Sequence, residues 1–257
     1  MISQFALRLL FGMSATWCVM PRGDVTCGFF RIQMLVALGF AVAATLFAGS
    51  LPAVEAGTAM LSGREMQVVA GLAAAACFVG SVYWTLARRR GGALFAGLVC
   101  GLSTAALLGS LPREAYSSVR SAALSGGSEL AAGWLIGGAF ATMLLGHWYL
   151  TAPMMKLRPL EILNRCLGAA AVTRGVIAAI AIGQLADFSP GQTQVIWLTM
   201  RWVCGILAPI AAMVLVRSIL RFRNTQSATG VLFAAVILVF IGETTAAVLS
   251  RDLRWPM

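Results

Sequence analysis

The chain has 257 residues, of which 60% are hydrophobic and only 11% are charged. A soluble domain of this length needs more polar surface than such a composition provides, so the sequence excludes an ordinary water-soluble fold. The net charge of +10 is spread over separate connecting segments, which argues against a nucleic-acid partner. We expect an all-α integral membrane protein, because backbone amides in lipid find their hydrogen bonds within helices.

The chain begins with an apolar stretch that Arg8 interrupts. The apolar residues that follow, 9–20, are fewer than the roughly 17 needed to cross a bilayer. We therefore expect residues 1–30 to form a cytoplasmic interfacial segment whose helix ends at Pro21. If the stretch spans instead, the bundle has eight helices and the N-terminus moves to the outer side.

Apolar runs of spanning length then fill residues 31–250. They cover residues 31–52, 66–87, 93–112, 130–152, 166–186, 195–216 and 228–250. Each is long enough to cross a hydrocarbon core of roughly 30 Å as a helix. The sequence thus predicts a seven-transmembrane-helix bundle, followed by a short outer-side tail at residues 251–257.

The first four of these runs show internal similarity. The tetrapeptide GSLP occurs at Gly49 and again at Gly109, and the tripeptide LSG occurs at residues 61–63 and 124–126. We interpret each LSG as the turn of a helical hairpin, and the pair of hairpins as a duplication. Chance similarity in a sequence rich in Ala, Leu and Gly is the alternative.

Two of the predicted spans carry small residues at every fourth position. They are Gly97, Gly101, Ala105 and Gly109 in one span, and Gly133, Gly137 and Ala141 in the next. Small side chains at this spacing let two helix backbones approach closely in a membrane. We expect these two spans to contact each other along their stripes.

Basic residues alternate between connections. Twelve lie on one expected side: Arg8, Arg22, Arg31, Arg88, Arg89, Arg90, Lys156, Arg158, Arg165, Arg217, Arg221 and Arg223. Five lie on the other: Arg64, Arg113, Arg120, Arg251 and Arg254. The positive-inside rule then places the N-terminus in the cytoplasm and the C-terminus outside a bacterial-type inner membrane. Anionic lipid headgroups account for the basic charge.

Two ionisable residues of opposite charge lie at matching depths in the last two spans. Arg201 lies about 9 Å and Glu243 about 10 Å from the outer ends of their helices, at 1.5 Å per residue. Buried charges in lipid are costly and are usually paired. We predict an intramembrane ion pair, with a proton or substrate relay as the alternative.

A second polar group lies toward the opposite side of the membrane. His147 and Arg174 fall within one helical turn of each other in depth, and Trp148 and Tyr149 lie beside the histidine. An imidazole and a guanidinium there would offer donors to a quinone carbonyl or a lipid phosphate. The alternative is an interfacial aromatic belt with an arginine that extends toward the headgroups.

Catalytic and metal-binding patterns do not emerge from the sequence. The six cysteines include no CxxC pair, and the chain has one histidine, which excludes a bis-histidine haem held by this polypeptide alone. We assign no catalytic residue and no metal ligand, and we expect a quinone or a bound lipid as the cofactor. Since we assign no catalytic residue, the sequence favours a protein that is not an enzyme.

These features together favour a non-catalytic membrane subunit of a larger assembly, in which electron transfer and contact with quinone or lipid are the expected roles. Its partners would be membrane lipids and either other membrane subunits or further copies of the chain. The alternative is a small transporter, in which duplicated hairpins enclose a polar path.

Overall fold

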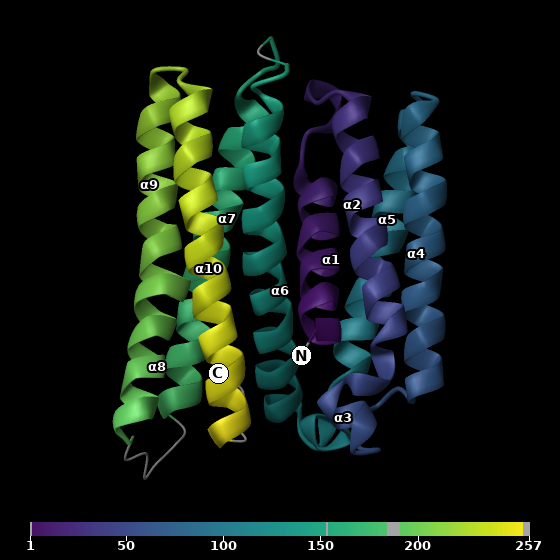
Figure 1. Ribbon diagram of the computed structural model, residues 1–257, viewed down its shortest axis with the longest axis vertical. Helices are drawn as coiled ribbons and strands as arrows, with labels where there is room; N and C mark the ends of the chain where they lie inside the picture. Colours follow the sequence, from purple (N-terminus) through teal and green to yellow (C-terminus); the bar gives the residue numbers. More distant parts are fainter. Residues whose placement is uncertain (1, 153, 184–190, 254–257) are drawn as a thin grey trace. The chain divides into compact units, whose positions relative to one another are not determined.

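The structure is a computed structural model that describes residues 2–152, 154–183 and 191–253 (Figure 1). Its contacts divide the chain into two compact units, Met1–Ala141 and Thr142–Met257. In the described ranges, β-type pairing is limited to an isolated antiparallel bridge between Ala59 and Pro112. The all-α class expected from the sequence is therefore confirmed.

The helices of the first unit are α1 (Ile2–Val19), α2 (Cys27–Leu46), α3 (Pro52–Glu55), α4 (Gly63–Thr85), α5 (Arg89–Gly109) and most of α6 (Val119–Trp148). The second unit contains the end of α6, α7 (Arg158–Gly183), α8 (Gln192–Trp202), the π-helical segment η4 (Val203–Leu207), α9 (Ala208–Arg221) and α10 (Thr225–Leu253). Helix α8, η4 and α9 run on as one span over residues 192–221.

Eight helices within the described residues are long and apolar enough to cross a membrane. The predicted number of seven spanning helices is therefore corrected to eight, which was the alternative expected if the first apolar stretch spans. The added helix is α1, which the sequence analysis treated as an interfacial segment. Leu7, Leu10, Met13 and Trp17 of α1 are fully buried, so this helix belongs to the interior of the first unit.

The charged residue that led to this error, Arg8, is neutralised by an ion pair within the first unit. Arg8 was counted as an interruption of the apolar stretch, but its guanidinium is paired with the carboxylate of Glu129 on α6. A charged residue shortens a predicted span only when it must stay in water. The pairing removes that requirement, and α1 runs from Ile2 to Val19 through Arg8.

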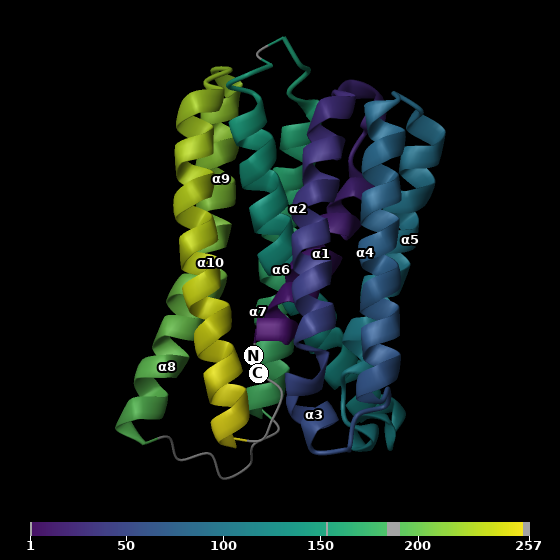
Figure 2. The ribbon, with the colours of Figure 1, turned by 45° about the vertical axis from the view of Figure 1, so that its right-hand side comes forward.

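In the first unit, α1 and α4 each pack against both α2 and α5, so that these four helices form a ring of neighbours (Figure 2). The core that they share is apolar and includes Leu7, Ala44, Leu51, Met66 and Leu107. Away from this core, near the start of α2 and the end of α4, the indole of Trp84 stacks on the ring of Phe30, with centroids 4.3 Å apart.

The turn before α4 is built by its own side chains. Ser62 Oγ accepts a hydrogen bond from the backbone N–H of Glu65, and Glu65 Oε2 accepts one from the backbone N–H of Ser62. This reciprocal capping starts a helix without exposed backbone donors. The predicted turn at residues 61–63 is thus present, whereas the predicted turn at 124–126 is wrong, because those residues lie inside α6.

Hydrogen bonds join separate segments at each end of the first unit, donated by the Arg89 side chain at one end and by a backbone N–H at the other. At one end, Arg89 donates to the carbonyls of Arg22 and Val25, which joins the α4–α5 connection to the α1–α2 connection. At the other end, Leu61 N–H donates to the carbonyl of Gly109 at 3.0 Å. The connections that carry most basic residues of this unit therefore lie at one end.

In the second unit, α10 packs against α8, η4 and α9, and α7 packs against α9 and η4. The turn between α9 and α10 is tight, and Arg223 adopts a left-handed backbone with φ of 56°. Asn224 then caps α10, since its side-chain oxygen accepts from the backbone N–H of Ser227 at 3.0 Å. Helix α10 therefore lies beside α8, η4 and α9, while α7 lies beside η4 and α9.

Candidate functional site: a buried arginine–glutamate cluster

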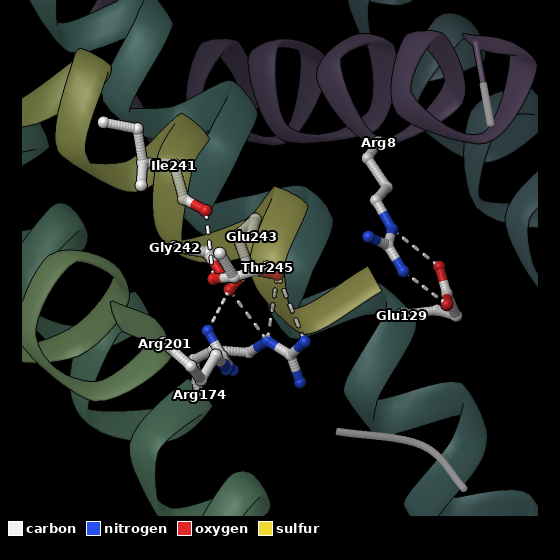
Figure 3. Close-up of polar contacts among 8 residues, drawn as sticks. All are labelled: Arg8, Glu129, Arg174, Arg201, Ile241, Gly242, Glu243 and Thr245. Atoms are coloured by element: carbon white, nitrogen blue, oxygen red, sulfur yellow. Dashed lines mark hydrogen bonds and ion pairs between the residues drawn. The ribbon is translucent and has the colours of Figure 1, made fainter. Parts of the chain in front are cut away.

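Glu243 of α10 is held by two arginines from two other helices (Figure 3). Arg174 of α7 donates through Nε to Oε1 at 3.1 Å and through Nη2 to Oε2 at 3.1 Å. Arg201 of α8 donates through Nη1 to Oε1 at 2.5 Å. Both carboxylate oxygens therefore accept charge-assisted hydrogen bonds, which are about twice as strong as neutral ones.

Burial makes this cluster energetically important. The exposed fractions of the Arg174, Arg201 and Glu243 side chains are 1%, 1% and 0%. Charges removed from water are stable only when they are paired and hydrogen-bonded, and removing one partner from such a group is strongly destabilising. The cluster thus fixes three helices of the second unit to one another.

The helix backbones meet next to the cluster. A Cβ atom built on Gly242 would lie 2.2 Å from the Cα of Gly205, far closer than real side chains approach. These glycines let α10 and η4 come into backbone contact, as small residues do in membrane bundles. Glu243 directly follows one glycine, and Arg201 lies one turn before the other. The close crossing is what brings Arg201 within reach of Glu243.

The same crossing contains the π-helical segment η4, residues Val203–Leu207. A π-helical turn adds a residue to the helix and shifts the face that follows it, and such turns are frequent at functional sites. Ile206 of this turn contacts α7, where a Cβ on Gly175 would lie 3.1 Å from its Cγ2. Helix α7 therefore places Arg174 and Gly175 directly against the irregular turn.

A second buried ion pair lies in the first unit. Arg8 of α1 donates through Nε to Glu129 Oε2 at 2.8 Å and through Nη2 to Oε1 at 2.6 Å, and Gln4 Nε2 adds a bond of 3.0 Å. Here too a glycine crossing adjoins the pair, since a Cβ on Gly12 would lie 2.7 Å from the Cα of Gly137. This pair was missed by the sequence analysis.

A signal for the missed pair was present in the sequence. Arg8 precedes Gly12 by one helical turn, as Arg201 precedes Gly205, and Glu129 precedes Gly133 in the same way. An arginine one turn from a glycine can reach across a close helix crossing, because the glycine brings the partner helix near. The pattern Arg-x-x-x-Gly is thus present at both of these crossings.

The predicted ligand site around His147 and Arg174 is not formed. Arg174 is buried and bonded to Glu243, whereas His147 is exposed and its ring meets the edge of Phe233 at 6.3 Å between centroids. Trp148 is half-buried. Tyr149 is buried, and its hydroxyl donates to the carbonyl of Lys156. Depth alone suggested the His147–Arg174 pairing, but the two side chains take different partners.

The predicted ion pair between Arg201 and Glu243 has the geometry expected of it, with Arg174 as a third member that the sequence analysis placed elsewhere. Matching depth identified Arg201 and Glu243, because both distances were counted from the same side of the membrane. Arg174 was counted from the opposite side of the membrane. Its long side chain and the close packing of α7 on η4 bring it to the same carboxylate.

The predicted contact between the two small-residue stripes is wrong. Gly133 and Gly137 of α6 pack against α1, where a Cβ on Gly133 would lie 3.4 Å from the Cα of Arg8. Gly97 and Gly101 of α5 have no neighbouring atom within 4 Å of a built Cβ. The error follows from leaving α1 out of the bundle, since α1 takes the place beside α6.

The remaining small residues divide between the interior and the surface. Ala141 of α6 is fully buried, and Gly109 at the end of α5 lies against the side chain of Leu61. Ala105, in contrast, is exposed on the same face of α5 as Gly97 and Gly101. We call these three exposed residues the α5 stripe.

Comparison with protein families, with curated proteins and with solved structures finds no match to the chain.

Proposed function

We propose that this multi-pass membrane protein is a non-catalytic subunit of a larger membrane assembly and that it binds a partner transmembrane helix along the α5 stripe. The observation that carries the proposal is the stripe itself. Gly97 and Gly101 have open space where a side chain would be, and Ala105 continues their row one turn later. Small residues four apart form the groove into which a second membrane helix packs.

The buried clusters support this interpretation over a pathway for substrate. The carboxylate of Glu243 is occupied by two arginines, and the backbones of Gly205 and Gly242 touch beside it. Such packing holds helices together and leaves no passage between α10 and η4 at this level. The quinone or lipid contact expected at His147 is not part of the proposal, because His147 and Arg174 take different partners.

The proposal includes an orientation. With eight spans both termini lie on one side, and the positive-inside rule makes that side the outer one, with the basic connections in the cytoplasm. The hydrogen bonds that join Arg89 to the α1–α2 connection agree with a common side for those two connections. Thiol labelling of single cysteines at Ile2, Glu114 and Ala87, in a cysteine-free variant, tests it. Labelling from outside at Ile2 and Glu114 but not Ala87 is expected, and the reverse would refute the orientation.

Extraction of the native protein under mild conditions tests the proposed role. We expect a stable complex with other membrane proteins, or with further copies of the chain, whose mass exceeds that of the 27.0 kDa protomer. A solitary protomer would contradict the proposal.

A small transporter is the second candidate, and the π-helical segment η4 is the observation that favours it. Irregular turns of this kind can mark a hinge, and η4 lies between a buried charge cluster and Pro209 of α9. A protomer that purifies alone and gains thermal stability with one class of small solute would support transport instead of the subunit role.

A further inference from the structure

A cavity of about 250 Å³ lies between α7 and α9 of the second unit. It is lined by Glu161, Asn164 and Arg165 from α7 and by Arg217, Leu220 and Arg221 from α9. The lining residues repeat one spacing on both helices, i, i+3 and i+4, which places each set on a single face. The cavity is thus a product of two facing helix surfaces near the start of α7 and the end of α9.

One wall of the cavity contains a buried polar group with an unused acceptor. Asn164 is 2% exposed, and its Nδ2 donates to the carbonyl of Met213 at 2.9 Å. This bond fixes the orientation of the amide, and the buried Oδ1 has no hydrogen-bond partner in the structure. A buried acceptor without a donor costs free energy, so a donor from a bound molecule would stabilise the site.

The rim of the cavity is basic. Arg165, Arg217 and Arg221 are exposed side chains, and Glu161 lies 4.0 Å from Arg165. Three guanidinium groups around one carboxylate leave an excess of positive charge at the rim. Arginine forks bind phosphate oxygens in pairs, and arginine is therefore common at phosphate sites.

We propose that this cavity binds a phosphate ester that carries a hydroxyl or ammonium donor, as the headgroups of phosphatidylglycerol and phosphatidylethanolamine do. Arg217 and Arg221 hold the phosphate, while Asn164 Oδ1 accepts from the headgroup donor inside the cavity. The position at the end of α9, among basic residues that the positive-inside rule assigns to the cytoplasmic face, suits a lipid of the inner leaflet. The site does not depend on the subunit role proposed above.

Binding of defined lipids to the purified full-length protein tests the site. We expect phosphatidylglycerol or phosphatidylethanolamine to bind about tenfold more tightly than phosphatidylcholine, whose headgroup has no hydrogen-bond donor. The variant Arg217→Gln/Arg221→Gln should bind the preferred lipid about tenfold more weakly. Both arginines are exposed, so this variant should keep its fold. Asn164→Leu should remove the preference over phosphatidylcholine.

A matched control separates a site from general attraction to anionic membranes. Arg88→Gln/Arg90→Gln removes the same charge from another connection on the same expected face and should leave lipid binding unchanged. Equal losses in both double variants, or equal binding of all three lipids, would overturn the proposal. Competition by inorganic phosphate at millimolar concentration would show that the same site takes free phosphate, whereas its absence would assign the site to lipid.

Discussion

Neutralising Glu243 should destabilise the protein more than any other single change of charge in the second unit. Glu243→Gln keeps the shape of the side chain but removes the negative charge that faces Arg174 and Arg201 in a site that is at most 1% exposed. Breaking a buried ion pair by removing one partner costs about 3 to 5 kcal/mol in the free energy of unfolding. Since two arginines lose their counter-charge here, we expect the upper part of that range.

Reversible unfolding in mixed micelles, followed by circular dichroism, measures this free energy. Glu161→Gln is the matched control, because the exposed pair of Glu161 and Arg165, at 4.0 Å, should contribute less than about 1 kcal/mol. The apolar triple variant Arg174→Met/Arg201→Leu/Glu243→Leu should recover much of the loss. A loss below about 1 kcal/mol for Glu243→Gln, or a triple variant less stable than the single one, would refute the reasoning.

Three further predictions concern single positions. Glu129→Gln should lower the free energy of unfolding by about 2 to 4 kcal/mol, somewhat less than Glu243→Gln, because the Arg8 and Glu129 side chains remain 10% and 11% exposed; an unchanged value would argue against the pair with Arg8. Gly242→Ala should weaken thermal stability because its Cβ would lie 2.2 Å from the Cα of Gly205, while Gly97→Ala, with open space around it, should not; equal Tm shifts would contradict the close crossing. Ala87→Gly should raise the free energy of unfolding by up to about 1 kcal/mol, since Ala87 has φ of 56° in the tight turn before α5. Ala93→Gly, inside α5, should lower it. Changes of the same sign in the two variants, relative to the native protein, would disprove the strain.

The spans themselves could be predicted from apolar run length, because a bilayer imposes one length on every helix that crosses it. The exception was α1, and its cause was specific. A charged residue inside an apolar run can mean that the run lies in the membrane interface, or that the charge is paired with a residue of opposite charge on another helix of the bundle. Only the position of Glu129 distinguishes these cases, and its distance in sequence from Arg8 hides it.

Turns were predicted less well than spans. The two LSG tripeptides are identical, but Ser62 is followed by Glu65 and caps a helix, whereas residues 124–126 continue through α6. Glycine and serine are tolerated in membrane helices, so they are weaker turn signals than in soluble proteins. The duplication of the first hairpins stays a prediction.

Partners across the bundle could be predicted only where depth decided them. The depths of Arg201 and Glu243 were counted from the same end of adjacent spans, and these depths alone predicted the contact between the two residues. Arg174 needed the rotation of α7 and its contact with η4, which a sequence does not contain. The packing of Gly133 and Gly137 failed for a similar reason, because neighbours in sequence are not the only neighbours in a bundle.

Copurification with a blocked α5 stripe tests the proposed role most directly. Gly97→Leu/Gly101→Leu fills open space on the surface and should leave the fold and thermal stability of the protomer unchanged. Ile237→Phe adds bulk to an exposed position of another helix, α10, and serves as the control. We predict that the glycine variant loses the partner that the native protein and the control retain. Retention of the complete complex by the glycine variant would contradict the account.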